Sequence, residues 1–227
     1  MTTIASNLQR VRERIAKACA EAGRDVNEVT LLAVSKTFGP DAVRAAHQAG
    51  QGAFGENYIQ EAVEKIALLA DLPLEWHCIG PIQSNKTRLV AAHFAWAHTV
   101  DRLKIAERLS EQRPPQLPPL RVCIQVNVDG GASKSGVAPE EASALAHAVA
   151  ALPRLALRGL MTIPEPAAGF EAQLAVHRKA RQLFDALRGE GLALDTLSMG
   201  MTADLEAAIH AGSTMVRVGT AIFGGRA

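Results

Sequence analysis

Lys36 is the residue of this sequence whose type and position best suit covalent chemistry. It closely follows the apolar run LLAV (31–34) and precedes Thr37 and Phe38. Burial near other cations lowers the pKa of a lysine towards the neutral amine, which is the form that attacks aldehydes. The position alone also fits a lysine that extends into solvent or pairs with Glu56.

Two glycine-containing segments near the end of the chain have the residue types of a phosphate site. SMG (198–200) and VGTAIFGG (218–225) supply hydroxyls and allow close backbone approach. The loops after the last two strands of α/β barrels often bind phosphate in this way. Tight turns would explain the same glycines equally well. A reactive lysine facing a phosphate site predicts a phosphorylated carbonyl ligand, and pyridoxal 5′-phosphate (PLP) and a sugar phosphate both fit.

Arg217 helps to choose between these two ligands. Its guanidinium is always protonated and could face the nitrogen of a pyridine ring. Because arginine cannot accept a proton, that nitrogen would stay unprotonated, and an unprotonated pyridine is a poor electron sink for carbanion chemistry. An ion pair with an acidic neighbour such as Asp195 is the alternative.

The elements that must position these residues repeat one pattern of a strand followed by a helix. The eight apolar segments of strand length are residues 29–35, 52–55, 75–80, 94–99, 120–128, 156–163, 195–200 and 214–219. Alternating strands and helices, with strands apolar on both faces, predict a parallel sheet covered by helices. A count of eight favours an α/β fold that closes as a single (β/α)8 TIM barrel.

Helix signals surround these strands. The spacing of Ile4, Leu8, Val11, Ile15 and Cys19 predicts an extra N-terminal helix that ends before Gly23. Further helices are expected to begin at Pro40 and Pro139, and after a capping Thr202.

In such barrels the chemistry lies at the carboxyl ends of the strands, so one mouth should collect the polar residues found there. Those residues are Lys36, Glu56, Asn57, His77, Asn127, Met161, Thr162, Ser198, Gly200, Arg217, Gly219 and Thr220. His77 fits a hydrogen-bonded core histidine at least as well. GGASKSG (130–136) lacks the glycine that a nucleotide-binding loop needs before Lys134, and predicts an exposed, mobile loop instead.

Composition excludes several classes of protein. The length of 227 residues and the hydrophobic content of 48% suit one domain over residues 1–227. A net charge of +1 gives no reason to expect nucleic acid or an anionic membrane as a partner. Three cysteines without metal-ligand spacing predict buried thiols and no metal site. We find no signal peptide and no apolar run of the ~20 residues that a membrane span needs, so we expect a cytoplasmic location.

Seven motifs together carry a resemblance to one family. They are AVSKTF (33–38), FGENYIQEA (54–62), WHCIGPIQSNKTR (76–88), QVNVDGGASKSG (125–136), GLMTIP (159–164), LSMGMTADLEAAI (197–209) and RVGTAIFG (217–224). On these motifs the chain resembles the pyridoxal phosphate homeostasis proteins, whose fold is similar to the N-terminal barrel domain of bacterial alanine racemase. The family's usual second acid after SMGM is replaced by Ala203, whereas Asp204 is kept.

The resemblance implies roles for particular residues. Lys36 would carry PLP as an internal aldimine, and Arg217 would meet the pyridine nitrogen. Ser198, Gly219 and Thr220, with Gly200 in the same loop region, would hold the phosphate. Asn57 would belong to the pocket, and His77 and Met161 would line it.

Two functions remain open at this point. One is a non-catalytic carrier, with no catalytic residues, that buffers PLP and supplies it to apoenzymes through transient contacts. The other is a PLP-dependent amino-acid racemase of weak activity. Racemisation needs a second acid/base group, which a separate β domain supplies in alanine racemase; here Tyr58, the only tyrosine, would have to substitute. We therefore favour the carrier, and expect a monomer because nothing requires partner exchange. An aldolase acting on a sugar phosphate is a distant third.

Overall fold

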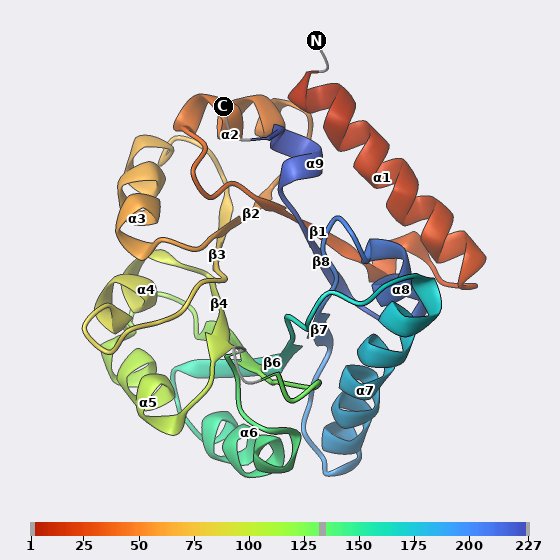
Figure 1. The fold of residues 1–227 in the computed structure, drawn as a ribbon. Helices are drawn as coiled ribbons and strands as arrows, with labels where there is room; N and C mark the ends of the chain where they lie inside the picture. Colours follow the sequence, from red (N-terminus) through yellow and green to blue (C-terminus); the bar gives the residue numbers. More distant parts are fainter. Residues whose placement is uncertain (1–2, 132–134, 226–227) are drawn as a thin grey trace.

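The computed structural model describes residues 3–131 and 135–225, and its eight parallel strands form one closed barrel in chain order. The strands are β1 (Thr30–Val34), β2 (Ala53–Glu56), β3 (Glu75–Cys78), β4 (Trp96–Val100), β5 (Leu120–Gln125), β6 (Leu155–Met161), β7 (Thr196–Ser198) and β8 (Met215–Val218). β1 pairs with β2 on one side and with β8 on the other, which closes the barrel (Figure 1). The predicted (β/α)8 barrel is confirmed.

Helices form the outer layer of the barrel (Figure 1). They are α1 (Ile4–Glu21), α2 (Pro40–Gln48), α3 (Ile59–Leu68), α4 (Thr87–His93), α5 (Leu103–Gln112), α6 (Ala142–Ala150), α7 (Phe170–Gly189), α8 (Leu205–His210) and α9 (Thr220–Phe223), with short 3-10 turns at Val26–Glu28 and Pro139–Glu141. None of the helices within the described ranges is long and apolar enough to cross a membrane.

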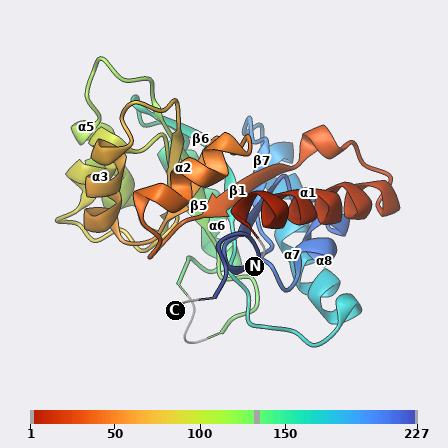
Figure 2. The ribbon, with the colours of Figure 1, turned by 90° about the horizontal axis from the view of Figure 1, so that it is seen from above.

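The extra N-terminal helix α1 is present as predicted and packs against α8 and α9 outside β1 and β8 (Figures 1 and 2). Thr3 caps it, because its side-chain oxygen accepts the N–H of Ser6 at 3.1 Å. The face built on Leu8, Val11 and Ile15 is buried. This helix therefore supports the last turn of the chain from outside.

Two helix starts differ from the prediction. Pro139 opens a single 3-10 turn, and the α-helix begins only at Ala142. Thr202 does not cap the next helix: α8 begins at Leu205, and Asp204 instead accepts the N–H of Met201 at 2.7 Å. The three residues after Met201 are thereby held as a turn at the mouth of the barrel. The expected exposure of Lys134 falls outside the described residues.

A buried ion pair fixes the ends of β1 and β2. Lys65 of α3 donates to Glu56 Oε1 at 2.7 Å and to the carbonyl of Ser35 at 3.0 Å, and the Ser35 hydroxyl donates to the same carboxylate at 2.6 Å. All three residues are at most 4% exposed. Burial raises the pKa of Glu56, and the hydrogen bonds from Lys65 and Ser35 partly offset this rise. Ser35 and Glu56 of this cluster directly precede Lys36 and Asn57 in the sequence.

We expect Lys65→Met to destabilise the fold by about 3–5 kcal/mol, because it leaves a buried carboxylate without its cation. Lys17→Met is the matched control, since the Lys17 side chain is 78% exposed and its pair with Glu21 spans 3.8 Å on the surface. The control should change stability by less than ~1 kcal/mol. Urea unfolding of both variants measures the difference, and equal midpoints would contradict the role given to the buried pair.

Candidate functional site

A cavity of about 400 Å³ opens at the carboxyl ends of the strands, on the side of the barrel where β1 and β8 meet. Its lining consists of Val34, Lys36, Asn57, Ile79, Ile163, Met201, Thr202, Ala203, Arg217, Gly219 and Thr220. Five residues predicted from the sequence are therefore brought together: Lys36, Asn57, Arg217, Gly219 and Thr220. We call this cavity the barrel-mouth pocket.

Lys36 is held in a tight turn just after β1. The N–H of Ser35 bonds the carbonyl of Gly55 at 3.0 Å, and the N–H of Phe38 bonds the carbonyl of Ser35 at 3.1 Å. Thr37 between them has φ of 69°, a left-handed conformation that costs a β-branched residue on the order of 1 kcal/mol. The Phe38 ring stacks on Phe223 of α9, with centroids 5.0 Å apart. The turn thus holds Lys36 at the wall of the barrel-mouth pocket.

Glu56 is not the partner of Lys36. Its carboxylate is engaged by Lys65 and Ser35, as described above, so the alternative in which Lys36 pairs with Glu56 is not what the structure contains. Lys36 itself is partly exposed and lines the pocket. Its amine is therefore accessible to a bound molecule.

Arg217 reaches the pocket from the interior of the barrel and is only 4% exposed. Its Nη1 donates to Ser198 Oγ at 2.8 Å, and its Nη2 donates to the carbonyl of Thr162 at 2.8 Å. Asp195, the alternative partner, is paired with Arg158 instead. Burial lowers the pKa of Arg217 to about 10, which still leaves the guanidinium charged at neutral pH.

Asn57 presents an unsatisfied acceptor. Its Oδ1 is buried and has no hydrogen-bond partner in the described structure. Gly80 makes this placement possible, because a Cβ there would lie 2.1 Å from the carbonyl oxygen of Asn57. An unpaired buried polar atom costs roughly 1–3 kcal/mol, so a ligand that donates to it would recover that energy.

A further wall of the pocket is made by the β8 end and the start of α9. Gly219 and Thr220 line the pocket there, and the first N–H groups of a helix have no partner within the helix. The amide of Asn7 in α1 donates to the carbonyl of Ile222 at 2.9 Å, which anchors α9. Backbone donors and a hydroxyl at this wall can hold an anion.

Four of the residues that were assigned a part in the cofactor pocket do not line it. His77 lies within β3 rather than after it; it is fully buried inside the barrel, where it stacks on Trp96. Met161 and Ser198 are also fully buried, and the Ser198 hydroxyl bonds Arg217 rather than facing the pocket. Gly200 supports the wall indirectly: its φ is 92°, and its carbonyl accepts the N–H of Arg217 at 2.9 Å.

Sequence reasoning missed several lining residues. Ile79 directly follows β3, and Ile163 lies two residues after β6, so strand boundaries two residues shorter would have identified both as strand-end positions. Met201, Thr202 and Ala203 belong to the turn that precedes α8. Their side chains carry no charge, and only the three-dimensional path of this turn reveals them.

Asn127, another strand-end residue, closes its own loop. Its Nδ2 donates to the carbonyl of Gly131 at 3.0 Å, and its Oδ1 accepts the N–H of Gly130 at 3.1 Å. The side chain therefore shapes the segment after β5 and is absent from the lining of the barrel-mouth pocket.

Comparison with known proteins gives a consistent picture. The family model described as "Alanine racemase, N-terminal domain" matches residues 4–227. The pyridoxal phosphate homeostasis protein of Pseudomonas aeruginosa is 63% identical, and the match covers 100% of this chain and 97% of that protein. The protein of the same name from Escherichia coli K12 is 55% identical, with 100% and 98% covered.

Solved structures agree with this assignment. PipY of Synechococcus elongatus PCC7942, solved with PLP bound, is 37% identical with a TM-score of 0.81, and the match covers 92% of this chain and 100% of PipY. Alanine racemase of Corynebacterium glutamicum is 21% identical with a TM-score of 0.67, covering 98% of this chain and 60% of the racemase, and shows the shared fold alone. Because the relatives match over essentially the full length at more than half identity, the chain belongs to the pyridoxal phosphate homeostasis protein family.

Proposed function

We propose that this chain binds PLP in the barrel-mouth pocket as a Schiff base on Lys36, and that it buffers the cofactor and supplies it to apoenzymes. The observation that carries the proposal is the presence of Lys36, Arg217, Gly219 and Thr220 on the walls of one pocket. The PLP-bound structure of PipY, which is 37% identical, supports the choice of ligand.

The donor set fits PLP group by group. Lys36 supplies the amine for the aldehyde, and Arg217 supplies a fixed cationic donor for the pyridine nitrogen. Gly219 and Thr220, at the start of α9, suit the phosphate, and the unsatisfied Oδ1 of Asn57 suits a donor on the ligand. When bound, PLP contributes a reactive aldehyde and a conjugated ring. The protein's part is to hold that ring against Arg217 and keep the pyridine nitrogen unprotonated.

The composition of the pocket favours a carrier over a racemase. Among its described lining residues, Lys36 is the one acid/base side chain, since Arg217 stays charged and the others are apolar, amide or hydroxyl groups. Tyr58 is 53% exposed and does not line this pocket. A racemase needs two acid/base groups, one on each face of its substrate.

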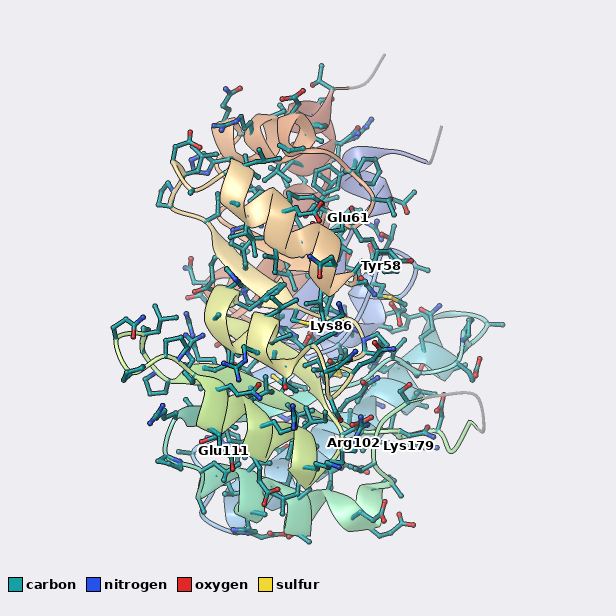
Figure 3. All side chains as sticks on the ribbon, turned by 90° about the vertical axis from the view of Figure 1, so that its left-hand side faces the viewer. Tyr58, Glu61, Lys86, Arg102, Glu111 and Lys179 are labelled. Carbon is teal, nitrogen blue, oxygen red and sulfur yellow. The ribbon has the colours of Figure 1, made fainter. Side chains whose placement is uncertain are left out.

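A groove beside the pocket supports hand-over to another protein. A hollow of about 500 Å³ shares Asn57 with the barrel-mouth pocket and is further lined by Tyr58, Gln60, Gln83 and Lys86, among others. Figure 3 shows Tyr58 between Glu61 and Lys86 on this outer side. An approaching group would therefore reach the cofactor from solvent. We expect the chain to act as a monomer in the cytoplasm, with transient contacts to apoenzymes.

Borohydride reduction of the PLP-loaded protein, followed by peptide mass mapping, should place the pyridoxyl group on Lys36. The reason is that this amine alone, among the lysines of the described pocket lining, can reach a molecule bound there. Lys86→Arg, in the neighbouring groove, is the matched control and should leave the labelling unchanged. A label on another lysine in the wild-type protein would overturn the assignment.

The loaded protein should reactivate a PLP-dependent apoenzyme faster than the same total concentration of free PLP. The expected cause is that reversible attachment to Lys36 keeps the aldehyde reactive towards the acceptor lysine while limiting its loss to other amines. Recovered activity against time is the measurement, with Lys36→Ala mixed with PLP as the control. Identical time courses for the loaded protein and free PLP would remove the delivery role.

The wild-type protein should show little exchange of the α-proton of L-alanine in deuterated buffer, measured by NMR. Arg217→Glu should raise any exchange, because a carboxyl group can protonate the pyridine nitrogen and make it a better electron sink. Tyr58→Phe should change nothing. Ready exchange in the wild type that Tyr58→Phe abolishes would establish the racemase alternative instead.

A further inference from the structure

A continuous row of polar side chains runs through the interior of the barrel, from the pocket to the opposite mouth. Arg217 bonds Ser198 Oγ at 2.8 Å, and Ser198 Oγ bonds His98 Nδ1 at 3.0 Å. His98 Nε2 bonds His77 Nδ1 at 2.8 Å, and His77 Nε2 bonds Glu75 Oε1 at 3.0 Å. Glu75 is the first residue of β3, at the end of the barrel away from the pocket.

The two end residues of this row, Arg217 and Glu75, determine which atom donates in each hydrogen bond between them. Arginine can only donate and a carboxylate can only accept. His77 Nε2 must therefore carry the proton given to Glu75, so a neutral His77 accepts at Nδ1 from the Nε2–H of His98. His98 in turn accepts at Nδ1 from the Ser198 hydroxyl, whose oxygen receives the Nη1–H of Arg217. Each bond then has one donor and one acceptor, and all point from the cation towards the anion.

The surroundings support neutral histidines between charged ends. Burial lowers the pKa of both His77 and His98, which keeps the rings neutral. Hydrogen bonding from His77 and the nearby charge of Arg121 lower the pKa of Glu75 and keep it ionised. Arg121 and the Trp96 indole N–H also donate to Glu75, at 2.7 and 3.1 Å.

We propose that Glu75 is a positioning residue for the PLP site: it sets the tautomers of His77 and His98, and through Ser198 it fixes the guanidinium of Arg217. Without Glu75, the donors of Arg121 and Trp96 would face His77 Nε2 and favour the reversed row. Ser198 Oγ would then accept hydrogen bonds from both His98 and Arg217, and its hydrogen bond with Arg217 would weaken. The effect expected on PLP affinity rests on the proposed function, whereas the effect expected on the histidine tautomers does not.

The first measurement is ¹⁵N NMR of the histidine rings in the full chain without added PLP. In the wild type, His77 and His98 should both be neutral with the proton on Nε2. In Glu75→Ala, His98 should move to the Nδ1–H form although it does not touch Glu75. Glu75→Leu, which keeps more of the side-chain volume, serves if the alanine variant does not fold. An unchanged His98 tautomer in the folded variant would overturn the proposal.

The second measurement is the affinity for PLP from its absorbance titration. Glu75→Ala should weaken binding by about tenfold, the effect expected when a hydrogen bond to a charged group is disturbed. Glu28→Ala is the control, because Glu28 precedes β1 at the same end of the barrel and pairs with Arg24 at the surface, at 3.2 Å. Equal affinities of Glu75→Ala and wild type would contradict the proposal. Failure of the wild type to bind PLP would instead refute the proposed function and leave the tautomer result standing.

Discussion

Closure of the barrel between β1 and β8 is the constraint on which the rest of the site depends. The register of this pair sets Leu32 beside Arg217 and Ala33 beside Val218. Lys36 follows β1 and Gly219 follows β8, so closure brings residues from the two ends of the chain to adjacent walls of one pocket. An open sheet with the same strands would leave β1 and β8 at opposite edges, and no such pocket would form.

Closure also creates an interior that must be filled, and part of this filling is polar. A buried arginine that hydrogen-bonds only neutral groups is costly, because its hydration is lost. Here the barrel compensates with neutral dipoles: a hydroxyl, a main-chain carbonyl and two imidazoles carry the hydrogen bonding of Arg217 towards a carboxylate at the other mouth. The guanidinium keeps its charge next to the pocket because its pKa, lowered by burial to about 10, still lies well above neutral pH.

The sequence predicted the architecture well because each strand and helix carries its own local signal. Lys36 and Arg217 were identified because charged residues at the ends of apolar strands are uncommon and barrels collect strand ends at one mouth. For His77 the sequence left a core position and a place at the rim both open, because a period-two pattern does not say whether a strand residue lies inside the barrel or at its mouth. Ile79 and Ala203 were missed because apolar and small residues carry no chemical signal of their own. The Ser35–Glu56–Lys65 cluster depends on a contact between a helix and two strand ends, which spacing alone does not reveal.

The pairing of the first and last strands has a consequence for how the protein is made. Lys36 leaves the ribosome early, whereas Arg217, Gly219 and Thr220 are among the last residues synthesised. The hydrogen bond from Asn7 to the carbonyl of Ile222 can also form only after the end of the chain has been made. A nascent or prematurely ended chain therefore presents Lys36 without the groups at the β8 end of the pocket. On the proposed function, selective capture of the cofactor would begin only when synthesis is nearly complete.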